Sequence, residues 1–174
     1  NLPAYRRPLP FIYQSTGVET RFTHLLDPDA RSREVFRFHR PATLLEWFNQ
    51  GEQLRGRLRT LPPLLDGQLW KVQSAAIRNL ESSLARNHPR ALIQMATGSG
   101  KTFTAVNSTY RLIKFANARR ILFLVDRSNL GRQTLKEFQQ FVTPDDGRKF
   151  TELYNVQHLS GSRIDDVSRV CITT

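Results

Sequence analysis

The sequence has little cysteine and no long apolar run. Cys171 is the only cysteine among 174 residues, so a disulfide within the chain and a zinc site of several thiolates are excluded. It lies in the strand-like run Val170–Ile172, where a lone cysteine acts most often as a small apolar residue. No apolar stretch has membrane-spanning length and none resembles a signal peptide, so we expect a soluble intracellular protein. The chain begins with Asn1 rather than methionine, which suggests a fragment.

Acidic residues are also few. Lys and Arg number 26 against 15 Asp and Glu, for a net charge of +11, and 21 of the basic residues are arginine. The excess is +3 over residues 1–66 and +8 over residues 67–174. Because the planar arginine fork suits phosphate groups, this balance favours a nucleic-acid partner; a solvated basic surface is the alternative.

A glycine-rich turn follows an apolar run in Ala91–Thr102, which reads ALIQMATGSGKT. Glycine tolerates positive φ, which lets backbone N–H groups turn inward around phosphates. The helical spacing that follows predicts a helix whose N-terminal dipole also favours an anion. The pattern therefore predicts a phosphate-binding loop for a nucleoside triphosphate, although Met95 stands where the general pattern has glycine. Its predicted contact residues are Thr97, Gly98, Ser99, Gly100, Lys101 and Thr102.

Two of these residues carry the predicted chemistry of the loop. Lys101 supplies a positive charge to the phosphates, and the Thr102 hydroxyl is placed to bind Mg²⁺ on the β- and γ-phosphates. A glycine-rich turn with an accidental Lys-Thr is the alternative, and the flanking strand and helix patterns argue against it.

The N-terminal third reads as short strands and one helix. The patterns predict a hairpin over Leu9–Phe22 with its turn at Ser15–Gly17, a half-buried strand at Val35–Phe38, and a short helix after Pro41 with Thr43 and Glu46 at capping-box spacing. Residues 49–66 carry alternating Arg and Leu and then two prolines, which is typical of a connector.

The remainder alternates helical and strand patterns. Helices are predicted over residues 69–84, after Lys101 and over residues 130–141, with strands at Ala91–Ala96, Ile121–Val125, Leu153–Leu159 and Arg169–Thr174. This order predicts an α/β fold with a parallel sheet and the phosphate loop at the carboxyl end of a central strand. The apolar run at Ile121–Val125 predicts a strand buried on both faces.

Two neighbouring features bear on the ligand. Gln73 lies on the predicted helix before the loop, where its amide could pair with adenine or could simply be solvated. A polar cluster follows the strand at Ile121–Val125 and favours contact with a nucleic-acid backbone; magnesium binding by its aspartate and an ordinary helix cap by its serine or asparagine are the alternatives. The cluster is Asp126, Arg127, Ser128, Asn129, Arg132 and Gln133.

The stretch from ALIQMATGSGKT through ILFLVDRSNLGRQ resembles the first RecA-like domain of superfamily 2 helicases, above all that of the motor subunit of type I restriction endonucleases. Upstream, LPFIYQSTGVETRF, SREVFRFHRP and TLLEWF resemble the piece that joins that subunit's nuclease domain to its motor; downstream, VTPDDGRKFTELYNVQHLSG and VCITT resemble its next stretch. The resemblance implies three parts: residues 1–48, the β-rich end of a nuclease domain; 49–66, the connector; and 67–174, part of a RecA-like domain.

The resemblance also implies residue roles and partners. Met95 is an ordinary occupant of its loop position, Gln73 matches the adenine-reading glutamine, and Asp126–Gln133 matches a DNA-contacting motif. Thr173 and Thr174 match the start of a further DNA-contacting motif. The implied cofactors are ATP and Mg²⁺, and the implied partners are double-stranded DNA and the specificity and methyltransferase subunits, in a bacterial or archaeal cytoplasm and away from membranes.

The implied function is an ATP-dependent DNA translocase and endonuclease subunit. Its acidic motif, arginine finger and nuclease residues would lie outside this chain, so we expect the chain alone to be inactive as an ATPase, because phosphoryl transfer needs those groups. Another superfamily 2 helicase or DNA-repair translocase, and a non-catalytic nucleic-acid-binding module, are the alternatives.

Overall fold

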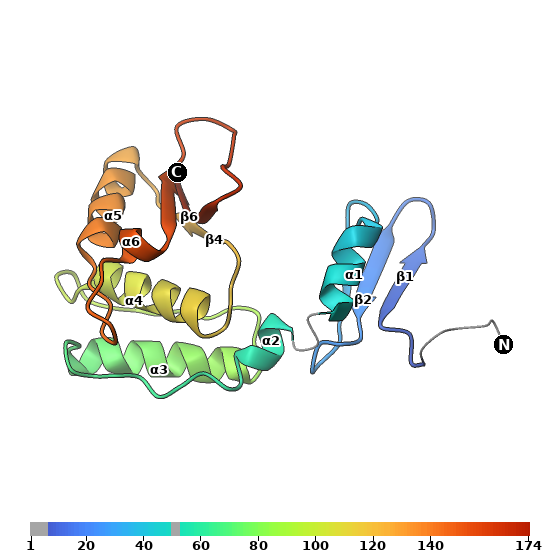
Figure 1. The fold of residues 1–174 in the computed structure, drawn as a ribbon, viewed down its shortest axis with the longest axis horizontal. Helices are drawn as coiled ribbons and strands as arrows, with labels where there is room; N and C mark the ends of the chain where they lie inside the picture. The colour runs from blue at the N-terminus through green and yellow to red at the C-terminus, as the bar shows by residue number, and fades with distance from the viewer. Residues whose placement is uncertain (1–6, 50–52) are drawn as a thin grey trace. The chain divides into compact units, whose positions relative to one another are not determined.

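The computed structural model describes residues 7–49 and 53–174 (Figure 1). The chain forms two compact units, Asn1–Thr60 and Leu61–Thr174. Their division falls inside the 49–66 stretch that the sequence predicts to be a connector.

The first unit is a three-stranded antiparallel sheet followed by helices. Its strands are β1 (Phe11–Ser15), β2 (Thr20–His24) and β3 (Ser32–Glu34), in the order β1-β2-β3, and its helices are α1 (Pro41–Asn49) and α2 (Leu54–Arg57). The turn between β1 and β2 has Gly17 at φ +88°, a left-handed conformation that suits glycine. The predicted hairpin is therefore confirmed.

Two predictions in this unit are wrong. Val35–Phe38 is not a strand: the Val35 N–H donates to Thr20 O over 2.8 Å, but the chain then bends and the Phe36 side chain is fully exposed. Thr20 is the first residue of β2, so β2 has no further residue with which Phe36–Phe38 could pair. The following helix begins at Pro41, whose fixed φ suits a first helical position, so Thr43 lies inside the helix and does not cap it.

Aromatic side chains form the interior of the first unit. Phe22 is 5% exposed, and its ring centroid lies 4.8 Å from that of Tyr13, 4.6 Å from His39 and 6.0 Å from Trp47. His24 is equally buried and packs edge-on against Phe11. The cluster joins both strands of the hairpin to α1.

The second unit is an α/β structure. Its elements are α3 (Lys71–Ala85), α4 (Lys101–Lys114), β4 (Ile121–Leu124), α5 (Ser128–Gln140), α6 (Phe150–Leu153), β5 (Asn155–His158) and β6 (Ser168–Thr173). The three strands are parallel in the order β4-β6-β5. The predicted α/β class and parallel sheet are confirmed.

The predicted strand at Ala91–Ala96 does not form. Residues 91–96 pair with no strand among the described residues, Leu92 is 93% exposed, and β6 is the centre of the sheet. A strand exists through its hydrogen-bonded neighbours, and none of the three strands lies beside this segment. The phosphate loop therefore does not follow a central strand of this sheet.

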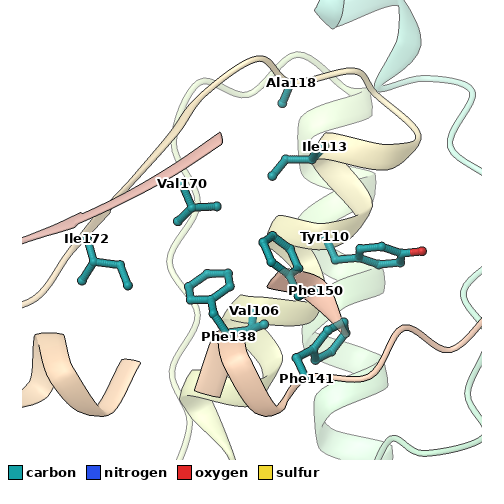
Figure 2. Packing of buried hydrophobic residues seen from close by; sticks show 9 residues of the cluster. All are labelled: Val106, Tyr110, Ile113, Ala118, Phe138, Phe141, Phe150, Val170 and Ile172. Atoms are coloured by element: carbon teal, nitrogen blue, oxygen red, sulfur yellow. The ribbon is translucent and has the colours of Figure 1, made fainter. Parts of the chain in front are cut away.

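One face of β4 is exposed, although Cys171 on the same face of β6 is buried. Leu122 and Leu124 of β4 are 54% and 67% exposed, which contradicts the prediction of burial on both faces, and β4 pairs only with β6 within the described ranges. The other face carries the core (Figure 2), where apolar residues of α4, α5, α6 and β6 converge. Fully buried members include Val106, Tyr110, Phe138, Phe150, Val170 and Ile172. Cys171 is a buried free thiol in β6, as predicted.

A buried ion pair joins α3 to α4. The Arg111 Nε–H donates to Glu81 Oε1 over 2.5 Å, and its Nη2 donates to Glu81 Oε2 over 3.1 Å. The same guanidinium donates to the carbonyl of Pro62 over 2.5 Å, so it also holds the start of the second unit against α4. The Arg111 side chain is 5% exposed.

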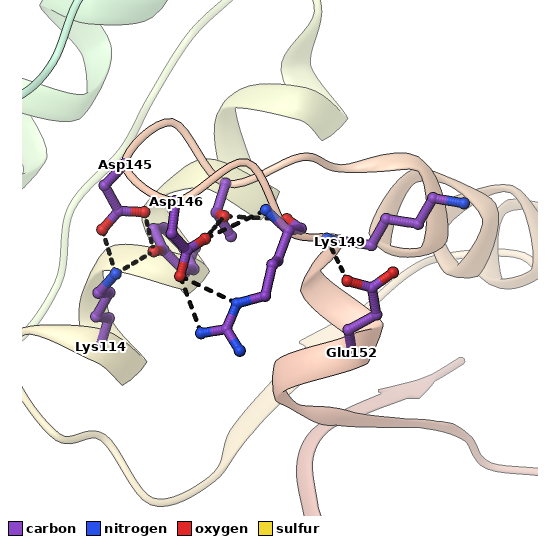
Figure 3. Close-up of polar contacts among 8 residues, drawn as sticks. Lys114, Asp145, Asp146, Lys149 and Glu152 are labelled. Atoms are coloured by element: carbon purple, nitrogen blue, oxygen red, sulfur yellow. Dashed lines mark hydrogen bonds and ion pairs between the residues drawn. The ribbon is translucent and has the colours of Figure 1, made fainter.

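A polar cluster at the far end of α4 holds the turn after α5 (Figure 3). The Tyr110 hydroxyl donates to Asp145 Oδ1 over 2.5 Å, and Lys114 forms an ion pair with the same carboxylate. Burial and the bond to Asp145 raise the pKa of Tyr110 to about 12. Asp146 bonds to Thr143 and Arg148, and these contacts hold the pKa of its carboxyl at about 2.

No described helix is both long and apolar enough to span a bilayer.

Candidate nucleotide-binding site

The glycine-rich loop leads directly into α4. Gly98 and Gly100 have φ of +81° and +79°, and Gly100 is the residue immediately before the helix. Both torsions lie in the left-handed region, where side chains with a Cβ are strained. The two glycines thus take the positive φ that the sequence predicts for them, beside the N-terminus of a 14-residue helix.

The carbonyl oxygen of Ala96 closes the loop on itself. It accepts hydrogen bonds from the Ser99 N–H (3.3 Å), the Ser99 hydroxyl (2.7 Å) and the Lys101 ammonium (3.1 Å). Lys101 therefore lies folded back along the loop. Its side chain is exposed, so a phosphate can take the place of this carbonyl without disturbing the core.

Gln73 connects α3 to the loop. Its Oε1 accepts from the Trp70 N–H over 3.0 Å, and its Nε2 donates to Ser99 O over 3.0 Å. The residue is only 5% exposed, so it is not the solvated glutamine of the alternative interpretation. The oxygen and the nitrogen of this amide can each make one more hydrogen bond, since the oxygen can accept twice and the nitrogen carries two hydrogens.

The two threonines after the loop differ. The Thr104 hydroxyl donates to Gly100 O over 2.9 Å and is used inside the helix. Thr102 lies in the first turn of α4 and is partly exposed. A hydroxyl at this point is a hard oxygen ligand of the kind that Mg²⁺ accepts.

The predicted DNA-contacting residues come together at one edge of the sheet. The strands β4 and β6 are parallel, with Leu124 opposite Thr173, and the Val125 N–H donates to Thr173 O over 3.0 Å. The cluster that follows β4 therefore lies beside Thr173 and Thr174 at the end of β6.

The cluster faces solvent as α5 begins. The exposed members are Asp126, Arg127, Ser128, Asn129, Arg132 and Gln133. Arg127 Nε lies 3.8 Å from Asp126 Oδ2, and both side chains are more than 70% exposed. The N-cap residue Arg127 makes no side-chain cap bond, but Asn129 Oδ1 accepts from the Leu130 N–H over 2.9 Å in the first turn of α5. Asn129 therefore stabilises the start of the helix, whereas Ser128 makes no such contact among the described residues.

A separate cavity of about 690 Å³ lies between α3 and residues 90–96. Its lining includes Ser99 but neither Lys101 nor Thr102, so it is not the phosphate site. No group of three side chains that could hold a metal ion occurs among the residues that the structure describes. His24 and His39 both pack against Phe22 and Trp47 in the aromatic interior of the first unit.

The family of the chain follows from comparison with known proteins. The family model described as "Type III restriction enzyme, res subunit" matches residues 66–174, which include the loop, Gln73 and the whole parallel sheet. The chain belongs to this family.

Some individual proteins are similar to this chain over more of its length than the family model. The type I restriction enzyme EcoKI endonuclease subunit of Escherichia coli K12 is 31% identical over 95% of this chain and 15% of its own length. The type I restriction enzyme EcoAI endonuclease subunit of Escherichia coli is 40% identical over 51% of this chain and 11% of its own length. A solved HsdR-subunit fragment from Vibrio vulnificus YJ016 is 20% identical, with a TM-score of 0.44, over 95% of this chain and 29% of that chain. The chain thus spans about one seventh of the first relative.

The role of the Ala96 carbonyl in the loop was not predicted from the sequence. The Ala96 carbonyl, which takes three hydrogen bonds, has no side-chain signature, so no residue pattern could have indicated it.

Proposed function

We propose that this chain is part of an ATP-dependent DNA translocase and endonuclease subunit of a type I restriction–modification system. The observation that carries the proposal is the loop with two left-handed glycines opening onto α4, in a chain similar to type I endonuclease subunits. In this proposal residues 1–48 end a nuclease domain, 49–66 connect, and 67–174 begin the first RecA-like domain.

The nucleotide is ATP with Mg²⁺. The backbone N–H groups of Thr97–Thr102 surround the phosphates, Lys101 exchanges the Ala96 carbonyl for a phosphate oxygen, and the Thr102 hydroxyl binds the metal. Bound Mg²⁺ supplies charge neutralisation on the phosphates. The residues present fit these groups because they offer N–H donors, one mobile cation and a hydroxyl at the N-terminus of a helix.

Gln73 reads the adenine. Its spare acceptor capacity on Oε1 and spare N–H on Nε2 match the N6 donor and N7 acceptor of that base. Because Nε2 already donates to Ser99 O, the same side chain also holds the loop.

The carboxyl edge of β4 and β6 contacts the backbone of double-stranded DNA. The exposed arginines Arg127 and Arg132 bind phosphate, and the short polar side chains beside them, with Thr173 and Thr174, accept or donate hydrogen bonds.

The protein partners in this proposal are the specificity and methyltransferase subunits, and the location is a bacterial cytoplasm.

The test of the loop uses the full-length protein that carries this chain. Lys101→Ala is expected to abolish DNA-stimulated ATP hydrolysis, whereas Lys136→Ala, at an exposed lysine of α5, is expected to leave it unchanged. Turnover by Lys101→Ala equal to that of the wild type would rule out the motor assignment.

The test of Gln73 is nucleotide selectivity. Gln73→Ala is expected to cause a smaller loss of hydrolysis and a weaker preference for ATP over GTP. If the loop loses both nucleotides equally, Gln73 acts only through Ser99 and the adenine role is wrong.

A further inference from the structure

Two phenylalanines and two arginines alternate on an exposed segment of the first unit, between β3 and α1. Phe36 is fully exposed and Phe38 is 58% exposed. Arg37 and Arg40 are also exposed, and neither side chain forms an ion pair with an acidic residue in the described part of the chain. The segment Val35–Arg40 therefore presents two exposed phenylalanines beside two arginines that form no ion pair within the described residues.

The segment is held in place. At its start the Val35 N–H donates to Thr20 O over 2.8 Å, and at its end Arg40 O accepts from the N–H groups of Thr43 and Leu44. In between, the Tyr13 hydroxyl hydrogen-bonds to His39 Nδ1 over 2.6 Å and accepts from the His39 N–H over 3.0 Å. His39, between Phe38 and Arg40, is thus anchored to Tyr13.

The Phe38 ring rests on the aromatic interior, whereas the Phe36 ring stands free in solvent. The Phe38 ring centroid lies 4.8 Å from that of Tyr13, and the His39 ring lies 4.6 Å from Phe22 in the aromatic interior. A ring that rests on the core through a neighbour keeps its orientation, so less conformational entropy is lost when a ligand stacks on it.

The chemistry of this surface fits nucleic acid with unpaired bases. Aromatic side chains stack on any base, and interleaved cations bind the phosphates between bases. Phenylalanine and arginine are also enriched in protein–protein interfaces, so a protein partner is the alternative that the experiment distinguishes. A base inside a duplex is already stacked on its neighbours, so an unpaired base stacks on an exposed ring without the cost of unstacking the duplex.

We propose that Val35–Arg40 binds single-stranded DNA, with Phe36 and Phe38 stacking on bases and Arg37 and Arg40 binding phosphates. Such a strand arises wherever a duplex is opened. This contact is separate from the loop and from the carboxyl edge of β4 and β6, and it goes beyond the proposed function because it names a second form of DNA and a second surface.

The experiment measures binding of a fluorescently labelled 30-nucleotide oligothymidine and of a 30-base-pair duplex to the full-length protein, without nucleotide. Phe36→Ala/Phe38→Ala is expected to weaken single-strand binding about 10-fold or more and to change duplex binding by less than about two-fold. Phe36→Trp/Phe38→Trp is expected to restore it. Val18→Ala is the matched control, because Val18 is fully exposed in the same unit and lies in the turn between β1 and β2.

The arginines have their own readout. Arg37→Gln/Arg40→Gln is expected to lower the dependence of single-strand affinity on salt concentration, because fewer counterions are released from the strand. The phenylalanine variants are expected to leave that dependence unchanged.

Three results would overturn the proposal. Single-strand affinity of Phe36→Ala/Phe38→Ala within two-fold of the wild type would remove the stacking contact, and equal losses for both DNA forms would show a general electrostatic surface. Intact DNA binding with loss of a partner subunit in co-purification would show a protein interface instead. Because no nucleotide is present, single-strand binding by Lys101→Ala separates this proposal from the ATPase assignment.

Discussion

Gly98 and Gly100 share a left-handed backbone but differ in their surroundings. A Cβ at Gly98 would meet nothing within 4 Å, whereas one at Gly100 would overlap Gln73 Nε2. The difference arises because Gln73 reaches across from α3 to donate to Ser99 O.

The two alanine variants are therefore expected to differ. Gly98→Ala is expected to lower the free energy of unfolding by roughly 1–2 kcal/mol, because alanine is strained in the left-handed conformation. Gly100→Ala adds displacement of Gln73, and so weakens ATP binding more strongly. Chemical denaturation and nucleotide titration check this, and Gly100→Ala/Gln73→Ala should recover part of the added loss of stability. Equal effects of the two single variants would contradict the geometry.

His24 makes the first unit sensitive to acid. It is 5% exposed, and neither ring nitrogen has a hydrogen-bond partner among the described residues. Burial lowers its pKa below the ordinary 6.5; Asp27 opposes this shift, while Arg33 and His39 add to it. Burial also lowers the pKa of His39.

The direction in which stability changes with pH follows from the lowered pKa of His24. Above pH 6.5 the imidazole is neutral in both states, and as the pH falls below 6.5 the unfolded chain takes up the proton first, so stability is lost. Urea denaturation between pH 8 and pH 5 should show this loss, and His24→Phe should reduce its pH dependence, whereas His88→Gln, at an exposed histidine, should not. Identical pH profiles for His24→Phe and the wild type would exclude this role of His24.

At the scale of elements, α3 and α4 are joined by a buried charge. Arg111 contacts Glu81 through two hydrogen bonds and the Pro62 carbonyl through a third. Removing one partner of such a pair leaves an uncompensated charge in a poorly solvated place.

Arg111→Met is expected to lower the free energy of unfolding by about 3–5 kcal/mol. The control is Arg78→Met on α3, whose pair with Asp66 is about half exposed and is expected to contribute less than about 1 kcal/mol. Arg111→Met/Glu81→Leu should recover much of the loss. A loss for Arg111→Met no larger than that of the control would show that the pair contributes little.

Elements governed by local sequence were predictable and those governed by distant partners were not. The hairpin around Gly17, the helices and the loop before Lys101 follow from turn chemistry and apolar spacing within a few residues. Ala91–Ala96 has the composition of a strand but no neighbouring strand, and no local pattern reports that. The Arg111–Glu81 pair spans 30 positions and leaves no periodic signal.

At the scale of the whole chain, each unit contains one of the two tryptophans. Trp47 lies in the aromatic interior of the first unit, with its ring 5.4 Å from that of His24, and Trp70 precedes α3 in the second. Trp47 is packed in the interior of its unit, whereas Trp70 is 62% exposed at the start of α3, so each tryptophan is expected to report its own unit, Trp47 with the larger change in fluorescence.

Trp70→Phe and Trp47→Phe are therefore expected to give different urea midpoints by fluorescence. The acid sensitivity of His24 should appear in the Trp47 signal alone. Coincident midpoints at every pH would mean that the units unfold as one cooperative structure.

The open side of β4 bears on how the chain behaves in concentrated solution. Its residues Ile121–Leu124 carry no charge and no proline, the features that usually protect an edge strand, and Leu122 and Leu124 are exposed. Two copies could align these strands and continue one sheet into the other. Ile121 and Phe123 pack against the core, while Leu122 and Leu124 on the opposite face favour self-association of this short strand.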